Sequence, residues 1–411
     1  MAIAGVLKRL GAVALFLASV GMILPLAAVA QEAVRPEIGK PLKAAGDLLK
    51  AGKHKDALAK IRDADAVSNK TANEIYLLER MRGSAAAGAG DSATAIKSFE
   101  AVMASGKVPA GEQSGIAQSL AILYYNARDF GNAIKWASRY LKEGGTNPQV
   151  RTVLIQSYFQ SGDFANTAKE ALADIQAEEK AGRTPPEEKL QLLANAYLRQ
   201  KNNGGYVATI EKLLNYYPKK SLWANIISHL QRKPGFSDRL SLDVFRLQLA
   251  TGNLSATNDF MEMAQLALQS GFPAEAKKIV DEGYTSGALG KGTDIERQKR
   301  LRDLVDKRAA ENKKLLESAA EVENAKSAKD GNALVILGYN LVTAGQAAKG
   351  TALMEEGIKK GGLKRPNDAK LWLGVALIQS GNKAKGVGVL KTVQGQDGVQ
   401  DLANLWTIFA R

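Results

Sequence analysis

Cysteine is absent from this 411-residue chain, and histidine occurs only twice. Without cysteine the chain forms neither a disulfide nor a thiolate metal site, so its stability has to come from packing. His54 and His229 lie far apart, and no HExxH motif or histidine–carboxylate spacing suitable for zinc accompanies them. No GxSxG motif or glycine-rich phosphate loop is present either. We therefore expect no metal, no cofactor and no enzymatic activity.

Long apolar runs are equally scarce, with one exception at the N-terminus. Lys8 and Arg9 precede an apolar run at residues 10–24, which leads into Ala28-Val29-Ala30. This order is typical of a secretory signal peptide with a small-x-small cleavage site, and an uncleaved anchor is the alternative. No later segment has the ~20 apolar residues needed to cross a bilayer. We predict a signal peptide at 1–30, cleavage between Ala30 and Gln31, and a periplasmic or secreted mature chain.

Positive charge exceeds negative charge, by 56 Lys and Arg residues against 42 Asp and Glu residues. Removal of Lys8 and Arg9 with the signal peptide leaves 54 against 42, a net charge of +12. Such a balance favours anionic partners, such as a lipid or an acidic envelope polymer, while export argues against nucleic acid. The alternative is a solvated lysine-rich surface that keeps the protein soluble.

The remaining sequence repeats a helical hairpin, most clearly at residues 115–148. Small and apolar residues three or four positions apart predict one stripe on each of two helices that face each other. Turn signals at Gly52, Gly90, Arg128, Gly162, Lys201, Pro234, Gly271, Gly345 and Gly381 are spaced by about 33 to 39 residues, except for one interval of about 74. The first stripe is Ala117, Leu120, Ala121 and Tyr124, and the second is Phe130, Ala133, Ala137 and Tyr140.

The hairpins resemble tetratricopeptide repeats (TPRs), whose signature is a leucine and a small residue, an aromatic, a glycine turn, an alanine and a final proline. Leu120, Ala121, Tyr124, Ala133 and Pro148 match it in this order. The resemblance implies an all-α right-handed superhelix whose first helices line a concave, partner-binding groove. We expect about nine hairpins in arrays at residues 31–290 and 331–411, a long charged helix within 291–330 that divides them, and a C-terminal capping helix at 399–409.

The resemblance also implies which side chains face the groove. They combine amides, which hydrogen-bond a peptide backbone, with aromatics, which contribute most at the desolvated centre of an interface. The aromatics can equally pack on a neighbouring unit. The implied groove residues are Gln118, Ile122, Tyr125, Asn126, Thr152, Gln156, Phe159, Gln160, Gln191, Asn195, Leu198 and Arg199.

Basic residues also gather in two later stretches, which we interpret as a candidate anionic docking surface. Cations near a helix C-terminus and the alternation of sign along the long helix offer a simpler explanation. The candidates are Arg297, Arg300, Lys359, Lys360, Lys364 and Arg365.

Together, these patterns favour a non-catalytic protein-interaction scaffold of the bacterial cell envelope that binds a peptide or protein partner in its groove. Two alternatives remain open. One is a binder of anionic envelope polymer or lipid, and the other is an accessory subunit of an envelope enzyme or secretion complex.

Overall fold

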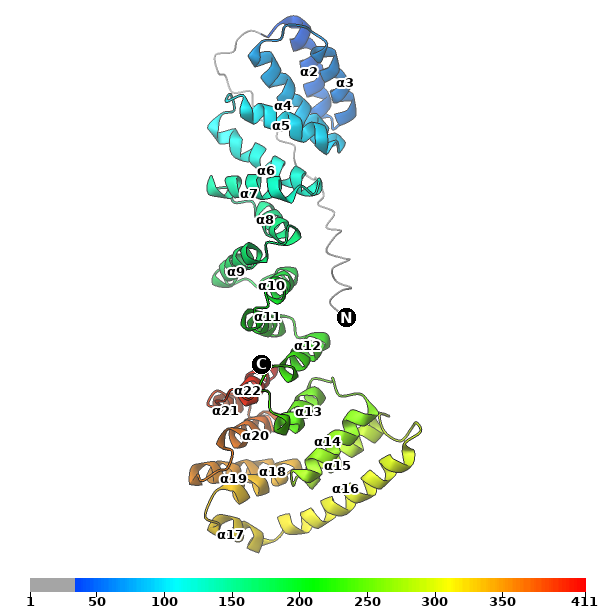
Figure 1. Ribbon diagram of the computed structural model, residues 1–411, viewed down its shortest axis with the longest axis vertical. Helices are drawn as coiled ribbons and strands as arrows, with labels where there is room; N and C mark the ends of the chain where they lie inside the picture. Colours follow the sequence, from blue (N-terminus) through cyan, green and yellow to red (C-terminus); the bar gives the residue numbers. More distant parts are fainter. Residues whose placement is uncertain (1–33) are drawn as a thin grey trace. The chain divides into compact units, whose positions relative to one another are not determined.

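The computed structural model describes residues 34–411, and all regular secondary structure in that range is helical (Figure 1). The signal peptide and cleavage site lie outside the described residues. Consecutive helices form nine pairs, as expected: α2 (Pro36–Lys50) and α3 (His54–Asp65), α4 (Ala72–Ala89) and α5 (Ser92–Ala104), α6 (Ala110–Asn126) and α7 (Phe130–Lys142), α8 (Pro148–Gln160) and α9 (Phe164–Lys180), α10 (Glu187–Arg199) and α11 (Asn203–Tyr216), α12 (Lys220–Gln231) and α13 (Ser241–Ala250), α14 (Thr257–Gln269) and α15 (Pro273–Thr285), α18 (Asn332–Thr343) and α19 (Ala347–Lys360), and α20 (Pro366–Gln379) and α21 (Lys383–Leu390).

The turns inside these pairs share one backbone geometry. At eight of the nine turn positions marked in the sequence the marked residue itself has a positive φ, and at the ninth Gly235, after Pro234, has it. Arg128 and Lys201 adopt this conformation without being glycine, with φ of 61° and 57°. In the turn at Arg128, the N–H of Asp129 donates to the carbonyl of Tyr124 at 2.9 Å. This left-handed closure stops one helix and allows the next to begin after two or three residues.

The described residues group into two compact units, which are residues 34–177 with 199–201 and residues 178–198 with 202–411. The boundaries predicted at 290 and 330 fall inside the second unit. In the first unit, small residues such as Ala121 and Ala133 are completely buried, so paired helices approach closely. Aromatic rings fill the flanks, and the Phe99 ring lies over Gly83.

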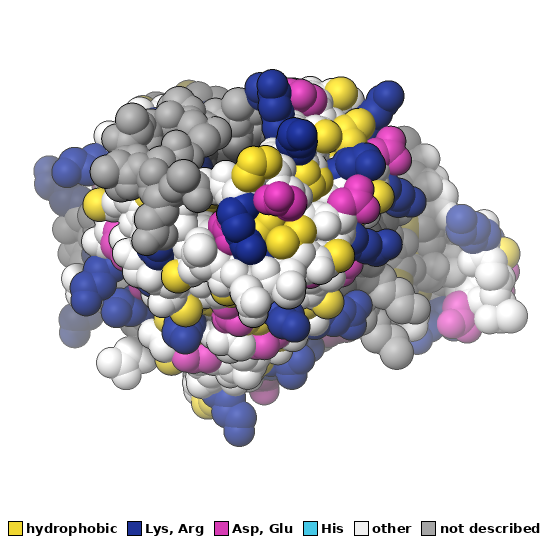
Figure 2. Space-filling model, turned by 90° about the horizontal axis from the view of Figure 1, so that it is seen from above, with side chains coloured by type: hydrophobic (Ala, Val, Ile, Leu, Met, Phe, Trp, Pro, Cys, Tyr) yellow, Lys and Arg dark blue, Asp and Glu magenta, His cyan; other side chains and the backbone are white. Residues whose placement is uncertain are grey.

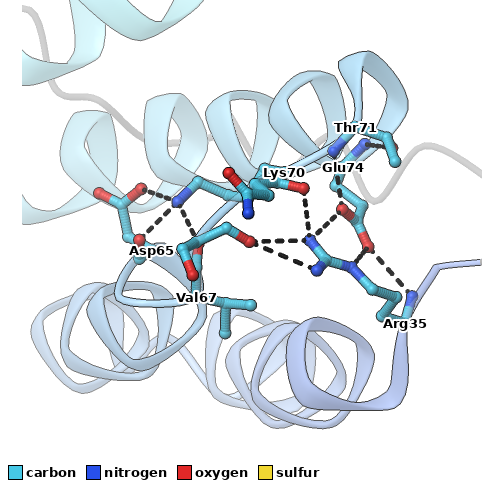
Figure 3. Close-up of polar contacts among 8 residues, drawn as sticks. Arg35, Asp65, Val67, Lys70, Thr71 and Glu74 are labelled. Atoms are coloured by element: carbon cyan, nitrogen blue, oxygen red, sulfur yellow. Dashed lines mark hydrogen bonds and ion pairs between the residues drawn. The ribbon is translucent and has the colours of Figure 1, made fainter.

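The N-terminus of the first unit is held by a network of charged groups (Figure 3). Arg35 donates to both carboxylate oxygens of Glu74, at 2.9 and 2.8 Å, and to the backbone carbonyls of Ser68 and Asn69. Glu74 forms a capping box with Thr71 at the start of α4. The hydrogen bonds from Arg35 and from the Thr71 N–H lower the pKa of Glu74 to about 2. The network therefore ties α2 to the loop that precedes α4.

In the second unit, one long helix was predicted between residues 293 and 329, but the structure has two helices there, α16 (Ile295–Leu316) and α17 (Ala319–Ser327). Extended backbone at Ser318 separates them. Leu301 and Val305 on α16 belong to a core cluster that also contains residues of α14 and α20, and α15 contacts α18 directly. The hairpins on the two sides of α16 therefore share one core.

The C-terminal helix α22 (Val399–Phe409) has the apolar face expected of a capping helix. Leu402, Leu405 and Trp406 are buried. It lies against α11, α13, α20 and α21 (Figure 1). The ring of Phe409 meets the Trp223 ring of α12 edge to face. The sequence did not indicate this placement, in which the last helix returns to the middle of the chain.

Candidate functional site

The predicted groove positions in the first unit lie on α6 and α8, two helices that contact each other. Asn126 is the last residue of α6 and Gln160 is the last residue of α8, and both are exposed. Two turns before Asn126 lies Gln118, and one turn before Gln160 lies Gln156, and both are half-buried. Each of these first helices therefore carries two amides, of which Asn126 and Gln160 occupy equivalent positions, and we call the four side chains the amide row. Its position was predicted by mapping the repeat, and its binding role stays a prediction.

Other predicted groove residues have intramolecular contacts. The Tyr125 ring lies 5.9 Å from the Phe130 ring, and the Phe159 ring lies 5.5 Å from the Phe164 ring. Each aromatic therefore packs on the first residue of the second helix in its own hairpin, which differs from the contact with a neighbouring unit that the alternative interpretation named. Burial raises the pKa of Tyr125. Ile122 is only 5% exposed. A groove cannot use Ile122 for contact, because α5, α7 and α8 all pack around α6.

The remaining predicted groove residues are polar and partly engaged. The Thr152 hydroxyl donates to the carbonyl of Pro148, and the Gln191 amide donates to Glu187 at 2.9 Å. Asn195 is half-buried, whereas Leu198 and Arg199 are exposed. The guanidinium of Arg199 lies 5.7 Å from the Phe164 ring centroid.

The predicted basic surface residues are all exposed. Lys359 and Lys360 occupy the last turn of α19, where cations interact favourably with the helix dipole. Lys360 also donates to the carbonyl of Lys326. Hydrogen bonds from Asn332, with Lys364 and Lys360 nearby, lower the pKa of Asp330. On the face seen in Figure 2, Lys and Arg side chains are interspersed with acidic and uncharged ones, so charge does not gather into one patch there.

A buried cluster of charged residues in the second unit was missed by the sequence reasoning. Arg246 on α13 donates to both carboxylate oxygens of Glu275 on α15, at 2.7 and 2.6 Å, and to Asp243 at 2.6 Å. The Tyr339 hydroxyl donates to Glu275 at 3.1 Å, and the Trp372 indole N–H donates to Asp243 at 2.9 Å. Helices α13, α15, α18 and α20 therefore meet at one guanidinium, which we call the Arg246 cluster with these four partners.

Aromatic rings enclose this cluster. The guanidinium lies 4.6 Å from the Tyr339 ring centroid, and the Phe272 ring meets the Tyr339 and Trp372 rings at 4.8 and 5.3 Å. Burial raises the pKa of Asp243, although Arg246 opposes this shift. Burial also opposes the charge on Arg246, but Glu275, Tyr339 and Asp243 hold its pKa above the ordinary arginine value. A charged group so deep in an apolar core requires paired partners on every side.

An open cleft of about 420 Å³ adjoins the cluster, and we call it the Arg246 cleft. Part of its polar lining comes from three residues of the cluster, Arg246, Glu275 and Tyr339. Apolar lining comes from Leu249, Ala250, Met263, Ile279, Val342 and Ala347, and further polar lining comes from Lys278, Glu282, Thr343, Gln379 and Ser380. The cleft has no local signature in the sequence, because its lining extends from residue 246 to residue 380.

Within residues 34–411, no group of three or more histidine, aspartate or glutamate side chains is arranged to hold a metal ion. A search of the same residues also finds no helix that combines the length and apolarity required to cross a membrane. His54 belongs to the first unit and His229 to the second, where the His229 ring packs against the Tyr206 ring at 5.0 Å. Burial lowers the pKa of His229, and the nearby positive charge of Arg232 lowers it further.

No protein-family model matches the sequence, and no curated protein matches it either. Among solved structures, the chain is similar to the TPR2AB domain of yeast Sti1, which is described in complex with an Hsp90 peptide. The two sequences are 15% identical, the match covers 66% of this chain and 98% of the Sti1 chain, and the TM-score is 0.34. It is also similar to a tetratricopeptide repeat protein from Parabacteroides merdae, with 12% identity, 83% and 99% coverage, and a TM-score of 0.32. Yeast Tom70 matches with 12% identity, 91% and 95% coverage, and a TM-score of 0.23.

The fold assignment for this chain comes from its own helices. Nine helix pairs follow one another at the predicted spacing, with the same left-handed closure at the turns and with small residues between the paired helices. The all-α, TPR-like architecture that the sequence predicts is therefore confirmed.

Proposed function

We propose that the protein is a non-catalytic scaffold of the bacterial cell envelope that binds a peptide or protein partner along the amide row. The observation that carries this proposal is the exposed amide at the last position of both α6 and α8, two helices in contact. An amide offers both a donor and an acceptor, so it can bind an extended backbone irrespective of the partner's side chains. The export signal predicted at residues 1–30 supports the location.

The first test is an affinity-tagged pull-down of the mature chain from an envelope extract of the source organism, at low and high salt. A defined protein partner that stays bound at high salt, and whose binding weakens in the double variant Gln156→Ala and Gln160→Ala, supports the proposal. The matched control is Lys135→Ala together with Lys142→Ala on α7, which lies outside the amide row. Equal loss of binding in both double variants would contradict the role of the row.

Two other outcomes correspond to the alternatives. Capture of polymer or lipid only at low salt would make positive charge the functional feature, because screened surface charges lose their attraction in salt. Appearance of an enzymatic activity only with the captured partner would indicate an accessory subunit. Export itself is tested by N-terminal sequencing of the protein from the envelope fraction, which should begin at Gln31.

A further inference from the structure

The Arg246 cleft is not explained by a scaffold that binds only along the amide row. Its volume of about 420 Å³ is in the range of ligand-binding sites, which run from about 300 to about 1,000 Å³. Arg246 and Tyr339 are almost fully buried, yet both reach the lining. A buried ion pair contributes little net stability compared with apolar packing. The stability of the fold therefore does not explain why the cluster places charged and hydrogen-bonding groups at this cleft.

The charges that line the cleft balance each other. Arg246 and Lys278 are positive, Glu275 and Glu282 are negative, and no other charged side chain contributes to the lining. A charged group entering the cleft would lose its hydration without gaining a net counter-charge, which is unfavourable. An uncharged apolar group would instead cover Met263, Ile279 and Val342.

Arg246 also keeps hydrogen-bonding capacity. A guanidinium has five N–H groups. Three of them donate to Glu275 and Asp243, and within residues 34–411 the other two have no acceptor. Arg246 contributes to the cleft lining, so a carbonyl oxygen that approaches its guanidinium there can accept from it and leave both ion pairs intact.

We propose that the Arg246 cleft takes an uncharged apolar side chain of a partner polypeptide, while a backbone carbonyl of the same segment accepts a hydrogen bond from Arg246. The inference rests on the proposed scaffold function and adds an anchor point in the second unit. The balanced lining charge, the apolar walls and the unused N–H groups together specify this occupant.

The experiment uses the full mature chain with methyl-labelled methionine and NMR detection. Met263 lines the cleft, whereas the equally buried Met261 does not, so the two methyl groups are a matched pair of reporters. The probes are three capped tripeptides, Ac-Gly-Leu-Gly-NH2, Ac-Gly-Lys-Gly-NH2 and Ac-Gly-Glu-Gly-NH2. The leucine peptide should shift the Met263 signal saturably and bind at least about tenfold more tightly than the charged peptides.

Two variants complete the test. Ala347→Phe places a ring in the cleft and should abolish the shift, whereas Ala348→Phe, at the next and exposed position outside the lining, should leave it unchanged. No shift of Met263 by the leucine peptide, equal binding of the three peptides, or equal binding to both variants would overturn the proposal. The two proposals can fail separately. If the leucine peptide binds in the cleft but the amide-row variants capture the partner as the wild type does, the proposed role of the amide row is contradicted and the role of the cleft is supported.

Discussion

The two compact units stabilise the same kind of hairpin by different means. In the first unit, Asp91, Asp129 and Asp163 follow the left-handed turn residue, and each accepts a hydrogen bond from the backbone N–H three residues later. In the second unit, Asn202 caps α11 in the same way, whereas the equivalent residues of the three later hairpins, Phe272, Gln346 and Asn382, make no side-chain cap. Local turn chemistry therefore stabilises the first unit more than these later hairpins.

Long-range contacts compensate in the second unit. The backbones of α18 and α19 approach each other at Gly338 and Gly350, and those of α20 and α21 approach at Gly374 and Gly386. The bond from Trp372 to Asp243 joins residues 129 positions apart, while the Arg35–Glu74 pair of the first unit joins residues 39 apart. We expect substitutions in the first unit to have small, local effects and substitutions in the second to have large, cooperative ones.

The largest expected effect is that of Arg246→Met. It leaves Glu275 and Asp243 buried without their cation, which should lower the free energy of unfolding by about 3–5 kcal/mol. The control is Arg139→Met in the first unit, whose pair with Glu143 is partly exposed and should contribute less than about 1 kcal/mol. Urea unfolding followed by circular dichroism measures both. Similar losses in the two variants would remove the contrast between the units.

Gly338→Ala tests the close helix crossing. A Cβ atom at this position would lie 2.5 Å from the carbonyl oxygen of Gly350, and backbone cannot move aside as a side chain can. We expect a loss of about 2–3 kcal/mol in the free energy of unfolding. Gly388→Ala is the control, because it has open space around it within α21 and should stabilise the helix by up to about 1 kcal/mol. A neutral Gly338→Ala variant in urea unfolding would show that the crossing is loose.

Asp129→Ala tests the capped turns of the first unit. Loss of the hydrogen bond to the Asn132 N–H should lower the free energy of unfolding by about 1 kcal/mol. Gln346→Ala, at the equivalent uncapped position of the second unit, should change it by a few tenths of a kcal/mol at most. The two variants are compared by urea unfolding, and the reverse order of effects would contradict the importance of the caps.

The smallest effect concerns pH and the N-terminal network. The pKa of Glu74 lies at about 2 in the folded chain, below that of an ordinary glutamate, so its carboxylate stabilises the fold at neutral pH. This contribution is fully present above the ordinary glutamate pKa and is lost as the pH falls towards about 2. The opening of α2 and α4, measured by hydrogen exchange and corrected for the intrinsic exchange rate at each pH, should therefore increase over this interval in the wild type and less in Glu74→Gln. The same increase in both proteins would exclude Glu74 as the cause.

Much of the local structure could be predicted because it depends on neighbours in the chain. The turn at Arg128 is an example, since its closure involves only Tyr124 and the residues that follow. The burial of Ala121 and Ala133 follows from their spacing for the same reason. Mapping of the repeat singled out the positions of the amide row on α6 and α8. Ile122, which the same mapping assigned to the groove, is buried, because three neighbouring helices surround α6.

The sequence by itself determined the all-α composition, the nine helix pairs, the positions of their turns and the apolar face of α22. Only the tertiary structure decided that α22 lies against α11 and α13, that α15 meets α18 across the long insertion, and that Arg246 is enclosed by residues from four helices. The physical reason is range. Helix periodicity, caps and left-handed turns act over a few residues, whereas ion pairs and packing between distant helices depend on which surfaces the folded chain brings together.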